Sequence, residues 1–439
     1  MSFIHSHSNE CLKSELDLFS IPPTQTSIES GSWVEYHPLA SLDTEGPIEF
    51  AISGSGEDYL DLAQTQLYVK AKITKADNTD LAADENVGPT NLLLQSLFSQ
   101  VDVTLNDKLL SQSTNTYAHR AYLETLLNHG SHALESHMTS SLWYTDTPGH
   151  MDSTTTGDDG NNIGLVKRSS FTSASKSVDL LGRIHSDIFF QDRYMLNGVA
   201  IRLRFIRSKD AFVLMSGVNN ASYKVKILHS ALLVRRVKIS PSIKIAHAKA
   251  LEIAPAKYPI RRVEMKVFSV PAGNFTVNQE NLFLGQVPQR LIIGCIDNSA
   301  LNGDFLKNPY NYKNFNLNYL AVHIDGQNES YRPLHPNYAA NNYIQSFNNL
   351  FAGVGKLYKD EGIPIDRQSY ASGYALYAYD LTPDLCDSGH FNLIKSGNVR
   401  LEMKFGTALP NTINVIVYAE YENIIHIDKN RNIILDYGA

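Results

Sequence analysis

Short stretches in which apolar and polar residues alternate recur along most of this chain. A period of two places every apolar side chain of a stretch on one face of a β-strand. The chain also contains 23 Tyr and 18 Phe, which favour such half-buried strands. Clear instances are residues 67–71, 101–105, 199–205, 263–267, 320–324 and 399–405. The pattern predicts an all-β protein whose sheets have one buried and one hydrated face.

One arrangement of these elements occurs twice. An alternating strand, a turn containing Asn or Asp and a polar stretch precede a short helix with one apolar face, at residues 117–127 and again at 343–351. The predicted N-caps of the two helices are Asn115-Thr116 and Asn341-Asn342. Each apolar face is wide enough only to cover one edge of a β-barrel.

Three pairs of strands follow the same order in the two halves of the chain. The pairs end at Ile52 and Val267, at Leu105 and Ile324, and at Phe205 and Phe405. About eight strands in each half suit two tandem jelly rolls, and the polar residues 147–162 look like an insertion in the first copy. The predicted domains are an N-terminal arm (1–40), a first jelly roll (41–240) and a second jelly roll (241–439).

The first 40 residues are rich in Ser and Thr, contain Pro22-Pro23 and show no sustained period. One patch of the arm is apolar: Leu16, Leu18, Phe19 and Ile21. A free, hydrated tail does not need such a patch. We therefore expect the arm to lie against its own subunit or a neighbouring one.

Charge argues against a protein that binds nucleic acid by sequence. The formal net charge is −7, whereas proteins that neutralise phosphates carry a basic surplus or long basic runs. The dense basic stretches are short, at 167–168, 235–238 and 261–262, and each lies in or beside a strand-like run. We interpret them as hydrated faces or paired charges.

Cysteine content and hydropathy indicate the compartment. Cys11, Cys295 and Cys386 are widely spaced and odd in number, which argues against a disulfide scaffold and fits a reducing compartment. No apolar run is long enough for a transmembrane segment, and the first residues do not resemble a secretory signal. We expect synthesis in the cytosol, while the compartment of any later assembly stays open.

Three groups of residues are candidates for binding metal. His5-Ser6-His7 with Glu10 lies in the arm, outside any strand, unlike the ligands of a cupin site. His129, His132 and His137 follow the first helix with Glu135, and 158–162 (DDGNN) resembles a calcium loop without its regular ligand spacing. Hydrated surface residues are the favoured interpretation of all three groups, and a weak cation site in the 147–162 loop stays open.

No motif for an enzyme is present: the chain lacks a nucleophile elbow, a P-loop and a dinucleotide fingerprint. We predict no catalytic residues, no metal and no cofactor. Jelly rolls also serve as carbohydrate-binding or carbohydrate-active proteins, which is the alternative function. Trp33 and Trp143 are too few for the aromatic platform of many sugar sites, which weighs against it.

Several long phrases resemble the major capsid proteins of Polinton/Maverick elements and adintoviruses, a double jelly-roll lineage of eukaryotic double-stranded DNA viruses. The phrases occur in order and cover most of the chain: SLFSQVDVTLNDKLLSQSTNTYAHRAYLETLLNHG (96–130), LLGRIHSDIFFQDRYMLNGVAIRLRFIRSKDAFVLM (180–215), VEMKVFSVPAGNFTVNQENLFLGQVPQRLIIGCI (263–296), NPYNYKNFNLNYLAVHIDGQ (308–327) and SGYALYAYDLTPDLCDSGHFNLIKSGNVRLEMKF (372–405). Neither the arm nor the 147–162 insertion carries a family phrase.

The resemblance implies a structural protein whose two jelly rolls stand side by side. Three such chains form a pseudo-hexagonal trimer, and these capsomers build the icosahedral shell of a virus or virus-like mobile element. The implied partners are further copies of the chain, a single jelly-roll penton protein, a packaging ATPase and a maturation protease. Under this interpretation the loops 147–162 and 207–222 face outward, and the two short helices fill the junctions between jelly rolls.

Overall fold

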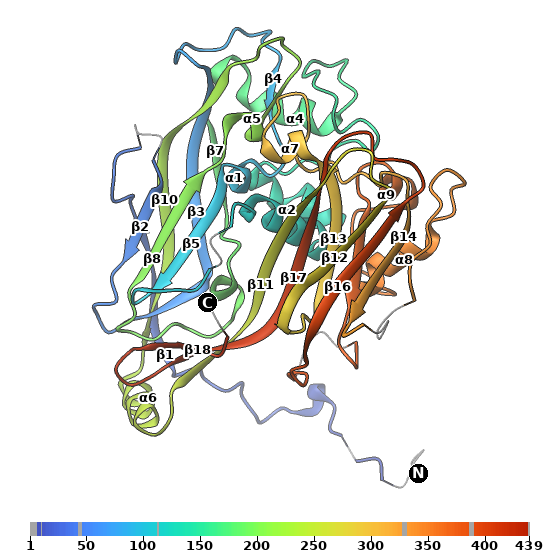
Figure 1. Ribbon diagram of the computed structural model, residues 1–439. Coiled ribbons are helices and arrows are strands. Elements are labelled where there is room, and N and C mark those ends of the chain that lie inside the picture. The colour runs from blue at the N-terminus through green and yellow to red at the C-terminus, as the bar shows by residue number, and fades with distance from the viewer. Residues whose placement is uncertain are drawn as a thin grey trace.

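Two pairs of antiparallel sheets stand side by side in the molecule (Figure 1). The computed structural model describes residues 7–9, 11–42, 46–111, 114–326, 332–385 and 390–437. Strands dominate, as the alternation predicts. The long strands bury one face and expose the other: residues of β8 (Ile201–Arg207) alternate between buried and exposed from Ile201 to Phe205.

The first pair of sheets contains eight strands. The larger sheet has the order β1 (Ile28–Tyr36), β10 (Tyr223–Ile239), β3 (Tyr59–Lys75) and β7 (Val178–Arg183). The facing sheet has the order β2 (Ile48–Ile52), β8, β5 (Phe98–Leu105) and β6 (Lys108–Leu109). Apart from β5 and β6, which pair with each other, successive strands of these two sheets alternate between them, which is jelly-roll topology. A separate ribbon pairs β4 (Val87–Pro89) with β9 (Leu214–Ser216).

The second pair of sheets repeats this order. The larger sheet contains β11 (Ala256–Val270), β17 (Ile413–Ile427), β13 (Arg290–Asp297) and β15 (Leu376–Asp380), with β18 (Ile433–Leu435) paired to β17. The facing sheet contains β12 (Thr276–Gln286), β16 (Ser396–Phe405) and β14 (Leu317–Ile324). Position by position, β11 to β17 match seven of the eight strands of the first jelly roll, and β6 has no counterpart among the described strands. The predicted duplication is confirmed.

Two of the three predicted strand pairs are equivalent and one is wrong. Strands β5 and β14, which end at Leu105 and Ile324, hold the same place, as do β8 and β16. The pairing of Ile52 with Val267 is incorrect, because Ile52 ends the second strand of its jelly roll whereas Val267 lies in the first strand of the other. The true counterpart of β2 is β12.

The cause of this error lies in β1, which falls inside the predicted arm. Strand β1 pairs with β10 along the edge of the larger sheet, so the sheet begins at Ile28 rather than after residue 40. Most of its residues are exposed on both faces, so no apolar alternation marks the strand in the sequence. The boundary between the jelly rolls near residue 240 stays a prediction.

Short helices connect the strands. Helices α2 (Tyr117–Asn128) and α8 (Ile344–Gly353) confirm the two predicted helices, although neither Thr116 nor Tyr343, the observed N-caps, makes a side-chain cap. The other helices are α1 (Leu93–Ser96), α3 (Ser131–Glu135), α4 (Ile163–Thr172), α5 (Asp210–Val213), α6 (Pro241–Ile253), α7 (Asn298–Asn302) and α9 (Arg367–Ala371), with 3-10 turns at Ser14–Leu16, His137–Ser141, Ser173–Ser175 and Asp187–Phe190. Among the described residues, no helix has the length and apolar character needed to cross a membrane.

The sequence did not predict α4 or α6. Helix α6 follows the long strand β10, and its alternating Ile243, Lys244 and Ile245 imitate a continuing strand. Pro241 at its first turn starts the helix, because proline lacks the backbone donor that a strand needs but a first helical turn does not. The extra segment of the first copy is real: α2 ends at Asn128 and β7 begins at Val178, whereas α8 ends at Gly353 and β15 begins at Leu376.

The core between the sheets generates a first prediction. Leu203 on β8 is 1% exposed, and truncating it leaves a cavity that close-packed neighbours fill only in part. We expect Leu203→Ala to lower the free energy of unfolding by about 3 kcal/mol, measured by urea denaturation. Leu39→Ala, at a leucine 63% exposed, is the control. Equal losses from both variants would contradict the assignment of Leu203 to the core.

Candidate functional site

Helix α2 lies at the seam between the two jelly rolls, in the centre of Figure 1. Ten of its twelve residues are buried, far more than the one apolar face that the sequence predicts. Side chains of both halves of the chain cover it. One hydrophobic cluster therefore runs from the first jelly roll through α2 into the second, while a separate cluster fills the second jelly roll.

Aromatic side chains form one side of this seam. The ring of Tyr122 on α2 stacks parallel to Tyr310 of the second half, with centroids 4.1 Å apart, and Trp143 packs on Tyr122 at 5.2 Å. His119 shares a hydrogen bond of 3.2 Å with the Tyr312 hydroxyl. Burial lowers the pKa of His119 to about 3, so the imidazole is neutral and packs as an aromatic ring.

Charged side chains form the other side. Arg120 on α2 contacts Glu124 at 2.8 Å and Asp187 at 2.7 Å, while His185 lies 2.6 Å from the second oxygen of Glu124. The Tyr418 hydroxyl of β17 donates to Glu124 at 3.4 Å, which connects this network to the second jelly roll. All of these groups are removed from solvent, so each buried charge needs its oppositely charged partner to offset the cost of losing water.

The two carboxyl groups of this network respond differently to burial. Burial raises the pKa of Glu124, but Arg120 and the hydrogen bond from His185 outweigh that effect and hold the pKa at about 2. Burial raises the pKa of Asp187, and the ion pair with Arg120 does not compensate for it. Glu124 is thus the carboxylate that the seam holds ionised.

A second buried ion pair lies near the loops within the first half, and residues of the second half donate hydrogen bonds to it. Arg168 on α4 and Asp146 are both fully buried, with 2.6 Å between the guanidinium and the carboxylate. Asn308 of the second half donates to Asp146 at 3.0 Å, and the Tyr374 hydroxyl donates to its backbone carbonyl at 2.8 Å. Asn162 donates to the same carboxylate at 2.9 Å. Removing the charge of Asp146 would leave a buried guanidinium without its counter-ion.

The predicted outer loop 147–162 lies partly in this seam. Met151 is buried, and the carboxylate of Asp152 lies 2.9 Å from the Lys313 amine while accepting from the Asn308 backbone at 3.0 Å. Asp158 and Asp159 are exposed. The first part of the insertion therefore fastens the two halves together, which its polar composition does not reveal.

Helix α8 has the same place in the second jelly roll as α2 has in the first. No other jelly roll of the described chain packs over α8 as the second jelly roll packs over α2. Only Ser346, Leu350 and Gly353 of its ten residues are buried. It packs on β15, and Arg290 donates to the Gly353 carbonyl at 2.8 Å. In Figure 1 it lies on the side of the second jelly roll that faces away from the seam. Ile344 is 51% exposed there.

Among the described residues, the groups that the sequence offered as candidate metal ligands do not form a cluster of ligand atoms. His7 is exposed, and His5 and Glu10 lie outside the described residues. The rings of His129 and His137 meet edge to face at 6.3 Å, and burial lowers the pKa of His129.

Elsewhere in the described chain, one other group, which the sequence did not single out, has ligand atoms within 4.8 Å of one another. It consists of Glu35, His37 and His229. All three side chains are exposed, and nothing buried holds them in a fixed geometry, so we assign no site to them.

The basic stretches are engaged in ion pairs. Arg235 contacts Asp61 at 2.7 Å, Lys238 contacts Glu29 at 3.1 Å, and Arg168 is the buried partner of Asp146. These contacts agree with the interpretation of the stretches as paired charges. Cys11 is exposed and Cys295 is buried, both as free thiols, while Cys386 lies outside the described residues.

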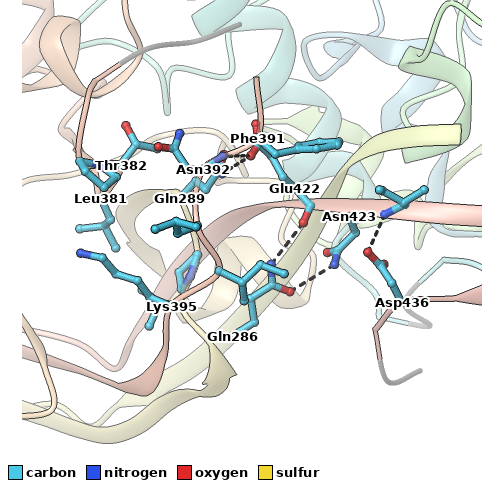
Figure 2. A pocket seen from close by; sticks show the side chains of 16 residues that line it. Gln286, Gln289, Leu381, Thr382, Phe391, Asn392, Lys395, Glu422, Asn423 and Asp436 are labelled. Atoms are coloured by element: carbon cyan, nitrogen blue, oxygen red, sulfur yellow. Dashed lines mark hydrogen bonds between the residues drawn. The ribbon is translucent and has the colours of Figure 1, made fainter. Parts of the chain in front are cut away.

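A pocket of about 150 Å³ with a mixed apolar and polar lining lies beside the end of β17 (Figure 2). Its amide and carboxyl groups bond to one another: Gln289 donates to Glu422 at 2.5 Å and Asn423 donates to Gln286 at 3.2 Å. The Asp436 carboxylate accepts from the Ile424 backbone at 2.9 Å. Because these groups already have partners, the pocket offers little to orient a sugar or another ligand.

Comparison with known proteins places the fold. No protein-family model matches the chain. An uncharacterised protein of Caenorhabditis elegans is 25% identical over 431 residues, which cover 95% of this chain and 99% of that protein.

Solved structures of viral origin share the whole architecture. A chain in the cryo-EM structure of the Sputnik virophage matches with a TM-score of 0.66 and 12% identity, covering 100% of this chain and 94% of that one. A chain of the PBCV-1 virus capsid matches at 0.57 and 12% identity (96% and 100% covered). The Faustovirus major capsid protein matches at 0.55 and 12% identity (93% and 92% covered). The chain has a double jelly-roll fold.

The buried ion pair at the seam yields a second prediction. Asp146→Asn keeps the shape of the side chain but leaves the Arg168 charge buried without a counter-ion. We expect a loss of about 3–5 kcal/mol in the free energy of unfolding. Glu49→Gln removes an exposed ion pair with Arg204 and should change stability by less than about 0.5 kcal/mol. Similar values for the two variants would contradict the role of the pair.

The third prediction concerns acid. Since the pKa of Glu124 is lowered from 4.5 to about 2, its contribution to stability is present above pH 4.5 and is lost as the pH falls toward 2. The stability difference between the wild type and Glu124→Gln should therefore shrink by up to about 3 kcal/mol across that range. Urea denaturation at a series of pH values measures it. A difference that stays constant with pH would show that the seam does not hold Glu124 ionised.

Proposed function

We propose that this protein is a major capsid protein, a structural subunit that assembles with itself into trimers and then into an icosahedral shell. The observation that carries the proposal is the unequal burial of two equivalent helices, α2 and α8. The fold is shared with solved capsid chains at low identity, which supports the same use.

The two helices define how copies would meet. Within one chain, α2 is covered because the second jelly roll packs against the first. Helix α8 is the corresponding element of the second jelly roll, and its apolar Ile344 is exposed. The first jelly roll of a further copy would cover α8 in the same way. Because the contact is head-to-tail, it closes into a ring when three chains, six jelly rolls in all, complete a full rotation.

Other parts of the proposal rest on the family resemblance. The shell would place this chain in the virion, with a single jelly-roll penton protein at the vertices, and the chain would have no catalytic role. The division into an arm, a first jelly roll ending near 240 and a second jelly roll is part of the same picture, with β1 belonging to the first jelly roll. The similar protein of Caenorhabditis elegans matches this chain over nearly its full length. A gene of this kind in an animal genome fits a mobile element or a domesticated copy of a viral gene.

Solution mass tests the proposal directly. Each chain has a mass of 48.9 kDa, so light scattering coupled to size exclusion should give three times this value, and electron microscopy should show hexagonal particles. A chain that remains monomeric across varied salt and pH would overturn the proposal. Saturable glycan binding by such a monomer would favour the carbohydrate-binding alternative.

The fourth prediction places the interface. Ile344→Arg puts a charge on the first residue of α8, where we expect the neighbouring copy to pack, and should shift the trimer to monomers in light scattering. Ile163→Arg is a matched control, because Ile163 is also the first residue of a helix and is 57% exposed compared with 51% for Ile344. If the control dissociates the trimer as much as Ile344→Arg, then α8 is not the interface.

A further inference from the structure

Helix α6 has no buried residue, although it contains thirteen residues and stands at the base of the molecule. Helices in proteins are normally stabilised by packing one apolar face against the rest of the fold. Here Ile245 is 58% exposed and Ile253 is 88% exposed. The helix thus stands away from the body of the chain and lacks part of its cover.

An apolar groove of about 690 Å³ separates α6 from the body. Its lining comes from the helix, from the junction of the two jelly rolls, and from the strands β1, β3 and β10. Large apolar residues among it include Ile243 and Leu251 on α6, Tyr194, Leu196 and Tyr258 at the junction, Ile28 on β1, Tyr59 on β3 and Ile239 on β10. A groove of this composition suits a short apolar segment in an extended conformation.

The N-terminal arm offers such a segment. Between residues 12 and 21 it carries five large apolar side chains that are all exposed: Leu12, Leu16, Leu18, Phe19 and Ile21, with Phe19 97% exposed. This segment, residues 12–21, extends the apolar patch of the arm by Leu12. The groove beside α6 and the segment 12–21 are both exposed to water in the single chain. Packing the segment into the groove would bury apolar area of both.

Charge at the rim of the groove has the opposite sign to that of the segment. Arg193 and Lys257 lie at the rim with Asp192, a positive balance. The segment carries Glu15 and Asp17, and of these two only Glu15 has a basic neighbour in the segment, Lys13 at 3.8 Å. Such complementarity favours this occupant and fixes its direction in the groove.

The segment is directed away from the groove of its own chain. Ser27 and Ile28 line that groove, but Pro22-Pro23 holds the preceding backbone extended and opposes a tight reversal. In Figure 1 the arm leaves the base near β1 and passes below the second jelly roll, away from α6. At about 3.3 Å per residue, the segment can reach roughly 20–50 Å from Ser27.

We propose that residues 12–21 of one copy bind in the α6 groove of the next copy of this chain. The inference rests on the proposed self-assembly, in which the first jelly roll of the next copy lies beside the second jelly roll under which the arm passes. The arm then acts as a clasp at the base of the ring. It adds a contact between chains that is separate from the α8 interface.

Mixed disulfide crosslinking tests this proposal. Phe19→Cys and Leu251→Cys are made on separate chains in a Cys11→Ser, Cys386→Ser background, and the two proteins are co-assembled and oxidised. We expect a crosslinked dimer of the two chains on a non-reducing gel, because the cysteines belong to different copies. Phe19→Cys mixed with Val218→Cys is the control, because Val218 is 40% exposed in a loop between β9 and β10, outside the groove, and should give no dimer.

Each outcome has a definite meaning. A dimer in the test mixture alone supports the clasp. If only a chain that carries both cysteines crosslinks, and does so within itself, the arm binds its own groove and the proposal is overturned. If trimers form in light scattering but no crosslink appears in either format, the clasp fails while the proposed function stands. If no trimer forms, the proposed function fails by the separate mass measurement.

Discussion

The burial of α2 between the two jelly rolls is the constraint on which the rest of the structure depends. A sandwich of two sheets fills its own interior but leaves its sides to other elements. In the first jelly roll, α2 closes one side, and the second jelly roll covers α2 in turn through the stack of Tyr122 on Tyr310. Asn308 of the second half donates to the buried Asp146, and Lys313 of the second half pairs with Asp152, so polar contacts across the seam add to the packing.

The same constraint explains why a duplicated chain exposes an incomplete surface. Duplication supplies each jelly roll with the same elements, so α8 has the place of α2 and needs the same cover. The described residues form two jelly rolls, and neither of them covers α8. Only three of the ten residues of α8 are buried, whereas α2 is almost enclosed. In a repeat architecture an end that stays open in this way is either capped by polar residues or covered by the next unit.

The sequence predicted the parts of the fold whose signal is local. Period-two runs such as that of β8 located strands, because alternation follows from one buried face. Strand β1 was missed because an edge strand exposed on both faces has no alternation. The seam was missed for another reason: Asp146 and Asn308 meet only through the tertiary fold, and the buried Arg168 looks like any basic surface residue. No short-range pattern marks contacts between residues so distant in the chain.

Connectivity also bears on the energetics of the proposed ring. Of the six seams between jelly rolls, three lie within chains and form on folding, so they carry no cost of association. The other three must form between chains, and each must offset the loss of translational and rotational freedom. The exposed apolar face of α8 is small for an interface that must offset this loss. A second contact through the arm, once the first has formed, is effectively intramolecular, so even a short apolar segment such as residues 12–21 strengthens closure. The proposed contact between the apolar arm and the uncovered α6 thus accounts for both exposed apolar surfaces, because burying them together would strengthen ring closure.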